Sequence, residues 1–464
     1  MNAMTQWIGH AALILLLAAS TADAAPKTFL ANDYGAKGDG TTLNTRYVQS
    51  AIDAAAAVGG VVTLSPGTYL TGSLFLKSGM TLDVPEGVTL IGSEKLEDYP
   101  MLPTRIAGIE MSWPAALINV CDQHGVTITG QGTIDGDGPI WWKSYWDLRA
   151  KYEPRGLRWA SDYDARRPRL ILVQNSSNIQ LGGGILLRRS GFWTVHILYS
   201  HDIHVDGVTI RNNEGGKGPS TDGIDIDSSR KVMVEHADID VNDDALCLKA
   251  GRDSDGLRVN RPTEDIVIRD SVVRRGAAGI TIGSETSGGF SNIEAYNITA
   301  LGGVSSGVLF KSALTRGGYA RGIRIHDLTL EGVAIPIHIT MNWNPSYSYA
   351  TLPDGVKDIP SYWVTLTTKV SEQQGLPHFS DVHIWNIKAT GAKSAFNVSA
   401  YPNATLDGFR LDHLEIAAAT AGTIANTKNW VFADNNIKTA DGSKPEFTDT
   451  TGNDTKELPY GESK

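Results

Sequence analysis

Two short acidic segments carry the residue types best suited to chemistry in this 464-residue chain. Asp222 lies in the sequence TDG, and Asp243 and Asp244 lie in the sequence NDD. If the two segments occupy neighbouring coils of stacked parallel strands, equivalent positions lie about 4.8 Å apart and the carboxyl groups meet on one face. Crowding raises the pKa of at least one carboxyl, which then supplies a proton donor beside an ionised base. Glycoside hydrolysis uses such a pair, an acid for the leaving oxygen and a base for the attacking water.

The same aspartates have other interpretations. Aspartate is common in turns, so stacked aspartates could close the corners of a solenoid or bind calcium. Adjacent negative charges at Asp243 and Asp244 raise the free energy of the folded chain, which favours a use for them. Spacing alone leaves hydrolysis and a structural role both open.

The elements that must position these residues are short β-strands in a long repeat. Runs rich in β-branched residues begin at positions 203, 232, 266, 293 and 323, an interval of about 30 residues that is typical of stacked repeats. Each run has alternating apolar residues and ends at Gly, Asn or Asp, and few hairpin turns separate the strands. The pattern predicts an all-β fold, a right-handed parallel β-helix solenoid.

The ends of the chain differ from this repeat. Residues 1–24 hold the apolar run AALILLLAA and an Ala-x-Ala ending, which predicts a signal peptide and an exported protein, periplasmic or extracellular. Residues 45–57 place Val48, Ala51, Ile52 and Ala55 on one helical face, which predicts an N-terminal helix that caps the solenoid. We expect the catalytic β-helix over residues 25–438 and a loosely ordered polar tail over 439–464.

Composition narrows the classes of partner. Lys and Arg total 41 and Asp and Glu total 51, a formal net charge of −10, which argues against nonspecific binding of nucleic acid. No apolar run is long enough for a transmembrane helix, so no membrane partner is expected. The two cysteines, Cys121 and Cys247, are too few for a disulfide scaffold or a cysteine-ligated zinc site. Whether they pair with each other stays open.

Two segments interrupt the repeat as long loops. Residues 139–169 hold four tryptophans and eight Lys or Arg against four Asp or Glu, and residues 342–377 hold further Trp and Tyr. Loops of this length are usually functional or disordered. Aromatic rings with cations suit sugar rings that carry carboxylates, although the tryptophans could simply cover one side of the solenoid.

Beyond these patterns, the chain resembles glycoside hydrolase family 28, the polygalacturonase family. The resemblance rests on NDYGAKGDG at 32–40, GQGTIDG at 130–136 followed by two tryptophans, the TDG and NDD motifs, and IGSE at 282–285. It covers roughly residues 28–435 and is similar to the bacterial exo-acting branch. It implies a pectin-degrading parallel β-helix, usually a monomer, that binds pectic polysaccharide or oligogalacturonides.

The resemblance also implies roles for single residues. Asp243 would be the general acid, and Asp222 and Asp244 would position and deprotonate a water, which inverts the configuration. No metal and no cofactor is implied. Lys311, in the sequence LFKS, lies where the family keeps a substrate-binding lysine, and Glu285 would lie in a turn near the cleft.

Three departures from the family pattern bear on the substrate. Ser220 stands where the family usually has Asn, Ala278 where it has His, and Leu309 where it has Arg. Loss of the His and the Arg allows a neutral sugar such as rhamnose on the leaving side, as in a rhamnogalacturonan galacturonohydrolase. Alternatively, Arg252 or Arg316 could replace the missing cation as a substrate-binding residue.

The expected function is therefore cleavage of α-galacturonosyl linkages in pectic polysaccharide. The long loops could wall off one end of the groove, which favours exo over endo action. Two hypotheses from other classes stay open. One is a calcium-dependent pectate lyase on the same fold, and the other is a noncatalytic carbohydrate-binding β-helix.

Overall fold

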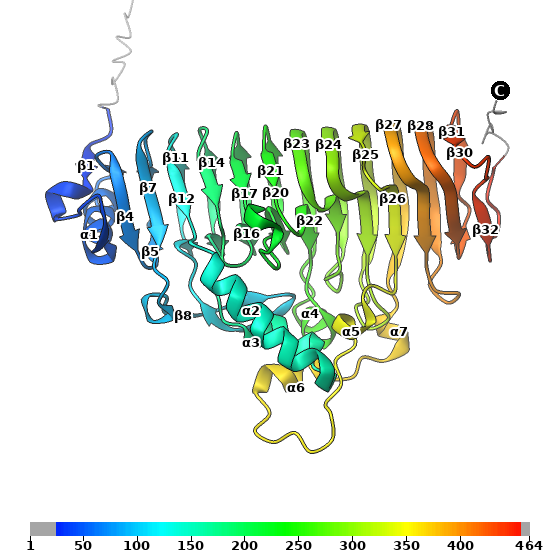
Figure 1. The fold of residues 1–464 in the computed structure, drawn as a ribbon, viewed down its shortest axis with the longest axis horizontal. Helices are drawn as coiled ribbons and strands as arrows, with labels where there is room; N and C mark the ends of the chain where they lie inside the picture. Colours follow the sequence, from blue (N-terminus) through cyan, green and yellow to red (C-terminus); the bar gives the residue numbers. More distant parts are fainter. Residues whose placement is uncertain (1–24, 456–464) are drawn as a thin grey trace, which may run out of the picture.

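Residues 25–455, which the computed structural model describes, wind into coils whose strands pair in parallel with those of the neighbouring coils (Figure 1). The predicted signal peptide at 1–24 lies outside the described residues. Parallel ladders run along the whole stack, and among the named strands of the described part only β8 (Met101–Ile106) and β9 (Ile109–Pro114) pair antiparallel, as a hairpin. This is the right-handed parallel β-helix that the sequence predicts.

Three ladders form the faces of the first half. The ladder that carries the aspartates contains β5 (Leu74–Phe75), β10 (Ile118–Cys121), β13 (Ile171–Gln174), β16 (Val195–Leu198), β19 (Ile224–Asp227) and β22 (Asp244–Lys249). The second contains β1 (Thr28–Leu30), β3 (Val61–Thr63), β6 (Thr81–Asp83), β11 (His124–Thr129), β14 (Ser177–Gly182), β17 (His201–Asp206) and β20 (Arg230–Glu235). The third contains β2 (Asp39–Leu43), β4 (Gly67–Thr71), β7 (Val88–Gly92), β12 (Thr133–Asp135), β15 (Leu186–Arg188), β18 (Thr209–Arg211) and β21 (Asp238–Asp240).

In the later coils, long strands continue around the corners of the coil and stay paired with the strands of the neighbouring coils. They are formed by β23 (Thr263–Ile282), β24 (Phe290–Lys311), β25 (Tyr319–Glu331), β26 (Ile335–Thr340), β27 (His378–Ser399) and β28 (Leu406–Ala425). Apolar residues at equivalent positions stack inside the coils, as Ile224, Leu246, Ile280 and Val308 do in the first ladder. Each coil buries its apolar face only against its neighbours, so the core is continuous along the molecule.

The helix α1 (Thr45–Ala56) closes the N-terminal end of this core, as predicted. Val48, Ala51, Ile52 and Ala55 are fully buried on its inner face. Gly59, with φ of 65°, ends the helical segment in a conformation that favours glycine. Among the described residues, no helix is both long and apolar enough to cross a membrane.

The C-terminal boundary differs from the prediction. Residues 439–455 were expected to be a loosely ordered tail, but they add to the last coil. β29 (Thr427–Lys428), β30 (Val431–Ala433), β31 (Asn436–Thr439) and β32 (Glu446–Thr448) all pair with β28. Even a polar segment can satisfy its backbone hydrogen bonds on an exposed strand edge, and this pairing covers the edge of β28.

Three insertions gather on one side of the solenoid (Figure 1). They are the β8–β9 hairpin, the segment with α2 (Pro139–Tyr152), η4 (Arg158–Ala160) and α3 (Ser161–Asp164), and the segment with α5 (Pro345–Ser348), α6 (Ser361–Thr367) and α7 (Glu372–Gly375). A second apolar cluster lies between the insertions, and its buried members include Trp113, Trp159, Tyr163 and Trp363. Trp159 and Trp363, two of the six tryptophans in the two long loops, therefore hold the insertions together.

Candidate active site

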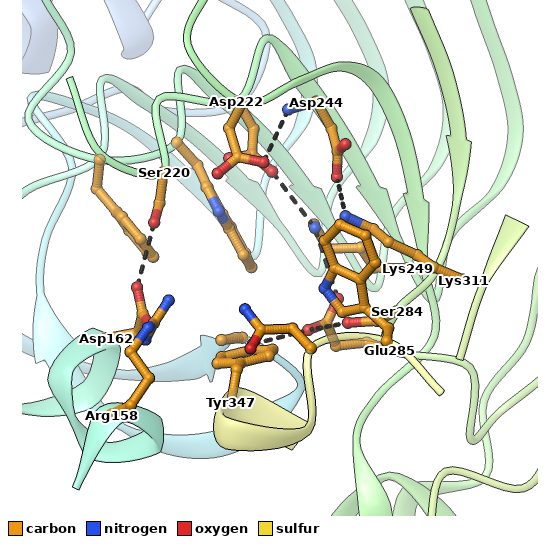
Figure 2. A pocket seen from close by; sticks show the side chains of 16 residues that line it. Arg158, Asp162, Ser220, Asp222, Asp244, Lys249, Ser284, Glu285, Lys311 and Tyr347 are labelled. Carbon is orange, nitrogen blue, oxygen red and sulfur yellow. Dashed lines mark hydrogen bonds and ion pairs between the residues drawn. The ribbon is translucent and has the colours of Figure 1, made fainter. Parts of the chain in front are cut away.

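The solenoid brings the three predicted aspartates to one cavity. Asp222 lies two residues before the start of β19, Asp244 begins β22, and the N–H of Gly223 donates to the Asp244 carbonyl at 2.9 Å. Carboxylate oxygens of Asp222 and Asp244 lie within 4.8 Å of each other. The Asp243 carboxylate accepts a hydrogen bond from the Asp244 N–H at 3.0 Å. All three line the same cavity, where Figure 2 shows Asp222 and Asp244 side by side.

The surroundings give these carboxyls different charge states. Lys311 Nζ donates to Asp244 Oδ2 at 2.7 Å and the Thr281 hydroxyl donates to Oδ1 at 3.0 Å, which stabilises Asp244 as a carboxylate. Burial and the neighbouring charge of Asp244 raise the pKa of Asp243 to about 6. Burial, followed by the charges of Asp225 and Asp243, raises the pKa of Asp222 well above its ordinary value. A proton donor and an ionised base therefore share one site.

A second lysine organises the other end of the cavity. Lys249, the last residue of β22, is 4% exposed. Its ammonium lies 3.4 Å from Asp222 Oδ2, 3.4 Å from Asp225 Oδ1 and 3.5 Å from Glu285 Oε2, as Figure 2 shows in part. Burial and the charge of Asp244 raise the pKa of Asp225 to about 7 against the lowering effect of Lys249.

Lys249 and Asp225 were not among the predicted site residues. Their place in the site could have been inferred from the sequence, because alternate residues of a strand point to the same face of the sheet. Asp225 lies opposite Cys247 and Asp227 lies opposite Lys249 in the β19–β22 pair, so these side chains all point outward beside the aspartates. Extending the alternation along both motifs would have placed them in the site.

Glu285 lies in the site, as predicted. Burial alone would raise the pKa of its carboxyl, but the positive charges of Lys249, Arg316, Lys311 and Arg252 lower it to about 2. The Tyr347 hydroxyl donates to Glu285 Oε1 at 3.0 Å. Glu285 is thus an ionised acceptor at the rim of the cavity.

Arg252 and Arg316, the predicted replacements for the missing cation, are fully buried in this structure, and neither lines the cavity. Arg252 donates to the Tyr163 hydroxyl at 2.9 Å and to the Tyr347 carbonyl at 2.8 Å. Arg316 donates to the Ser284 carbonyl at 3.1 Å and pairs with Asp253 at 2.5 Å. The arginines instead fix the segments behind Glu285.

The departures from the family pattern fall in two places. Ser220 lines the cavity, and its hydroxyl donates to Asp162 Oδ1 at 3.2 Å. Ala278 lies opposite Asp244 in the ladder and is fully buried, and Leu309 lies opposite Thr281 and is 2% exposed. Neither Ala278 nor Leu309 lines the cavity.

The insertions close the cavity from outside. Arg158 and Asp162 come from η4 and α3 and pair at 2.7 Å, while Trp343 and Tyr347 come from the segment around α5 (Figure 2). Ala107 of the β8–β9 hairpin completes the wall. The cavity has a volume of about 140 Å³. The sequence predicted that the two long loops lie near the site, but not which of their residues face it.

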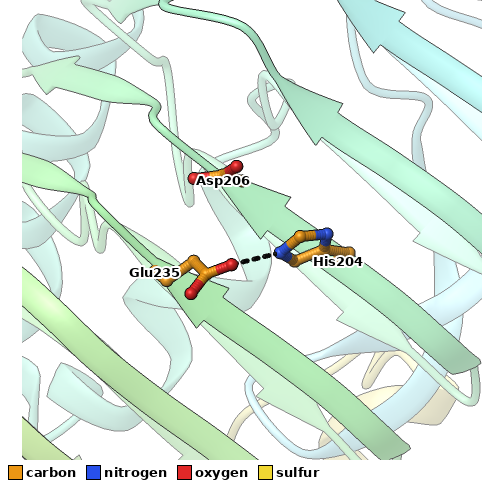
Figure 3. Close-up of side chains that lie close together, drawn as sticks. All are labelled: His204, Asp206 and Glu235. Carbon is orange, nitrogen blue, oxygen red and sulfur yellow. Dashed lines mark hydrogen bonds and ion pairs between the residues drawn. The ribbon is translucent and has the colours of Figure 1, made fainter.

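Three groups of side chains in the described part of the chain have the spacing of metal ligands, and two of them share Glu235, the third group being Glu235, His236 and Asp270. In the site, Asp222, Asp244 and Cys247 converge, but Lys249 and Lys311 already neutralise the carboxylates. On the outer face of the second ladder, His204, Asp206 and Glu235 lie together (Figure 3). There Glu235 pairs with His204 at 2.8 Å and with Arg269 at 2.5 Å, so existing ion pairs account for the group.

A parallel β-helix that holds a proton donor and an ionised carboxylate in one walled cavity belongs to the carbohydrate-cleaving enzymes of this fold. The sequence profile of Glycosyl hydrolases family 28 matches residues 67–405, and the chain belongs to that family. A second profile, described as Rhamnogalacturonase A/epimerase, pectate lyase-like, matches residues 29–96. The chain is thus a polygalacturonase-like glycoside hydrolase.

Relatives of known sequence or structure agree with this assignment. The chain is 33% identical to a probable polygalacturonase of Vitis vinifera over 322 residues, 67% of this chain and 62% of that protein. It is 28% identical to an exo-poly-alpha-D-galacturonosidase of Dickeya chrysanthemi over 352 residues, 68% of this chain and 57% of that protein. The chain therefore spans less than two thirds of the length of either relative.

Solved structures show the same fold. An exopolygalacturonase from Thermotoga maritima superposes with a TM-score of 0.71 at 25% identity, covering 92% of this chain and 93% of that one. A family 28 exopolygalacturonase from Yersinia enterocolitica superposes with a TM-score of 0.76 at 22% identity, covering 94% and 79%. Because its identity is below 25%, the Yersinia structure supports only the assignment of the fold.

Proposed function

We propose that this protein hydrolyses α-galacturonosyl linkages at the ends of pectic chains, with inversion of configuration. The observation that carries the proposal is the division of roles in the cavity. Asp243 has a pKa raised to about 6 by burial and by Asp244, and the ammonium of Lys311 pairs with Asp244 at 2.7 Å. This is the acid and base pair that glycoside hydrolysis requires.

The proposed reaction proceeds in one displacement. The Asp243 carboxyl gives its proton to the glycosidic oxygen as the bond from that oxygen to the anomeric carbon breaks. A water bonds to the anomeric carbon from the opposite face, and Asp244 takes the proton that the water loses. Asp222, within 4.8 Å of Asp244, orients this water. The products are one free sugar and the shortened chain.

The walls of the cavity favour exo over endo action. Arg158 and Asp162 on one side and Trp343 and Tyr347 on the other leave a space of about 140 Å³, whereas an internal cut needs a groove that is open at both ends. A pocket of this kind receives the end of a chain. The names of the Dickeya and Thermotoga relatives, which are exo-acting enzymes, support the same choice.

The residues of the site support a calcium-dependent lyase less well than a hydrolase. Calcium takes six to eight oxygen ligands, and a lyase uses several carboxylates for it. In this site Lys311 pairs with Asp244 at 2.7 Å and Lys249 lies 3.4 Å from Asp222, so ammonium groups occupy the oxygens that calcium would need. The noncatalytic alternative does not account for a buried carboxyl with a raised pKa.

The Asp243→Asn variant tests the proposal. We expect kcat to fall by a factor of about 10² to 10⁴, the usual contribution of general acid catalysis, while binding of oligogalacturonides persists. Asp238→Asn is the matched control, because Asp238 pairs with Arg274 on the outer surface. Turnover of Asp243→Asn at the wild-type rate would contradict the general-acid assignment.

Export and a monomeric state complete the proposal. They are supported only by the N-terminal pattern at residues 1–24 and by the resemblance to the family. Sequencing the N-terminus of the protein from its native source and measuring its mass in solution would test both. An intact residue 1 or a stable dimer would contradict them.

A further inference from the structure

One tryptophan of the long loop at 139–169 is exposed to solvent. Trp146 of α2 is 41% exposed, whereas Trp141, Trp142 and Trp159 are buried. Trp146 lines neither the catalytic cavity nor the second apolar cluster. The roles already described for the insertions therefore leave this indole ring unexplained.

The exposed ring is held in a fixed position. Its indole N–H donates to the Lys217 carbonyl at 2.8 Å. The Tyr145 ring packs edge-on against it with centroids 5.1 Å apart, and the guanidinium of Arg149 lies 5.3 Å from the ring centre. Because the ring is already fixed in the free protein, little side-chain freedom is lost when a ligand stacks on it.

Trp146 forms part of a surface hollow of about 630 Å³ between α2 and η5 (Glu214–Gly216). Figure 1 shows α2 lying along the outside of the coils. The lining residues are Pro139, Trp142, Lys143, Trp146, Glu214 and Lys217, and none of them lines the catalytic cavity. The buried guanidinium of Arg167 packs 4.3 Å from the Tyr145 ring and 4.4 Å from the ring of Phe192, which lines the cavity. Buried side chains therefore separate the hollow from the cavity.

The charged residues of the hollow are two lysines and one glutamate. Lys217 is exposed, and its ammonium forms no ion pair with any residue in the described part of the chain. Lys143 is exposed and pairs with Asp147 at 2.5 Å. The carboxylate of Glu214 lies 3.9 Å from Arg188. An anion at the apolar floor of the hollow thus meets the free ammonium of Lys217 on a chain whose net charge is −10.

We propose that this hollow is a second binding site, which holds an interior stretch of an acidic polysaccharide chain away from the bond that is cleaved. The apolar face of a sugar ring stacks on Trp146 and Pro139, and the carboxylates of the chain pair with Lys217 and Lys143. A chain held at the hollow raises the effective concentration of chain ends at the cavity. This inference rests on the proposed function for the identity of the polymer, a polyuronate.

Binding is measured by affinity electrophoresis through gels that contain long-chain polygalacturonate or neutral galactan. The Asp243→Asn protein is used, so that the polymer stays intact, and a long polymer has many interior units for each chain end. We expect the additional change Trp146→Ala to weaken binding of polygalacturonate about tenfold. Lys217→Met should also weaken it, and neutral galactan should bind more weakly than polygalacturonate.

Hydrolysis of digalacturonate separates the hollow from the cavity, because a dimer has no interior stretch. As a single change, Trp146→Ala should leave kcat/KM on digalacturonate within about twofold of the wild-type value and raise KM on the polymer. Ile140→Ala is the matched control, since Ile140 is also on α2, is 42% exposed and does not line the hollow.

Three results would overturn the inference and leave the proposed function standing. They are undiminished polymer binding after Trp146→Ala, equal binding of neutral galactan, and a loss of kcat/KM on digalacturonate as large as the loss of polymer binding. No hydrolysis of digalacturonate or of the polymer by the wild-type protein would overturn the proposed function, and the electrophoresis would still decide whether the hollow binds the polymer.

Discussion

At the scale of single residues, the site holds more carboxyl groups than positively charged groups. Five carboxyl groups, those of Asp222, Asp225, Asp243, Asp244 and Glu285, surround two buried lysines. Buried carboxyls without a full complement of cations retain protons. The raised pKa values of three of the five carboxyls are the result, and one of these protons is available to a substrate.

The pH profile of the reaction follows from Asp243. Its pKa rises from 3.8 to about 6 in the folded protein, so the proton that it donates is lost above that pH. We expect kcat/KM to fall as the pH rises through about 6, because Asp243 then loses the proton that it donates. Rates measured between pH 3 and pH 9 would show this, and a flat profile from pH 6 to pH 9 would contradict it.

The same shift has a consequence for stability. A carboxyl whose pKa is raised on folding stabilises the native state most below its unfolded pKa of 3.8, and this contribution is lost as the pH rises through about 6. Asp243 therefore makes the free energy of unfolding smaller at neutral pH than at acidic pH.

Lys249 offers a separate test of the charge balance. In Lys249→Met the ammonium shared by Asp222, Asp225 and Glu285 disappears, and the pKa values of these carboxyls should rise further. We expect a loss of about 3–5 kcal/mol in the free energy of unfolding, the usual effect of breaking a buried pair, and a larger loss at pH 8 than at pH 5. Denaturant unfolding at both pH values measures this.

The control for this variant is Lys143→Met, because Lys143 is exposed on α2 and pairs with the exposed Asp147. It should change the free energy of unfolding by no more than about 1 kcal/mol. A Lys249→Met protein as stable as this control at pH 8 would show that the lysine does not hold the carboxyls together.

At the scale of elements, strands and insertions have different tasks. The strand ladder sets the spacing of Asp222 and Asp244, since parallel strands repeat at about 4.8 Å. The insertions supply the walls and determine which part of a chain can enter. This explains why the motif residues could be predicted from the sequence while Arg158, Asp162 and Trp343 could not. Their positions depend on packing between loops that are far apart in the chain.

The contact between the two longest insertions should control chain-end specificity. Trp363 of α6 packs on Trp159 with ring centroids 5.1 Å apart, and its indole N–H donates to Asp164 Oδ1 at 3.1 Å. In Trp363→Ala we expect the wall to loosen, so that oligosaccharides longer than one unit appear among the early products. The thermal midpoint of the solenoid should fall by only a few degrees.

Mass analysis of early products would measure this change. Val364→Ala is the control, because Val364 is the next residue of α6 and is 54% exposed. A Trp363→Ala protein that still releases only single sugars would mean that the strand ladder, and not the insertions, sets the product size.

At the scale of the whole molecule, the fold was predictable because its signal is repeated. Each coil carries the same alternation of apolar residues, so an error in one coil does not change the prediction, and α1 stands out as the amphipathic segment at the start. The tail was mispredicted because its polar sequence pairs through the backbone with β28, and composition does not record backbone pairing. The burial of Arg252 and Arg316 could not be predicted for a related reason, since it depends on partners that are distant in the sequence, Tyr163 for Arg252 and Ser284 for Arg316.

The cap should be essential to solubility. Ile52 is fully buried where α1 closes the end of the apolar core, and solenoids with open ends associate. We expect Ile52→Asp to reduce the soluble monomer in size-exclusion chromatography and to lower the thermal midpoint. Asp53→Asn, one residue further on the exposed side of α1, should behave as the wild-type protein does. An unchanged monomer peak for Ile52→Asp would contradict the capping role.

The most direct measurement of the central claim is proton NMR of the first sugar released from an oligosaccharide that ends in an α-galacturonosyl residue. We expect free galacturonate to appear as a single unit, at first in the β-anomeric form, and the Asp243→Asn variant to release it at least about 10² times more slowly. An α-anomer as the first product would contradict inversion. An unsaturated, ultraviolet-absorbing product, or internal fragments before any single sugar, would contradict the proposed hydrolysis at chain ends.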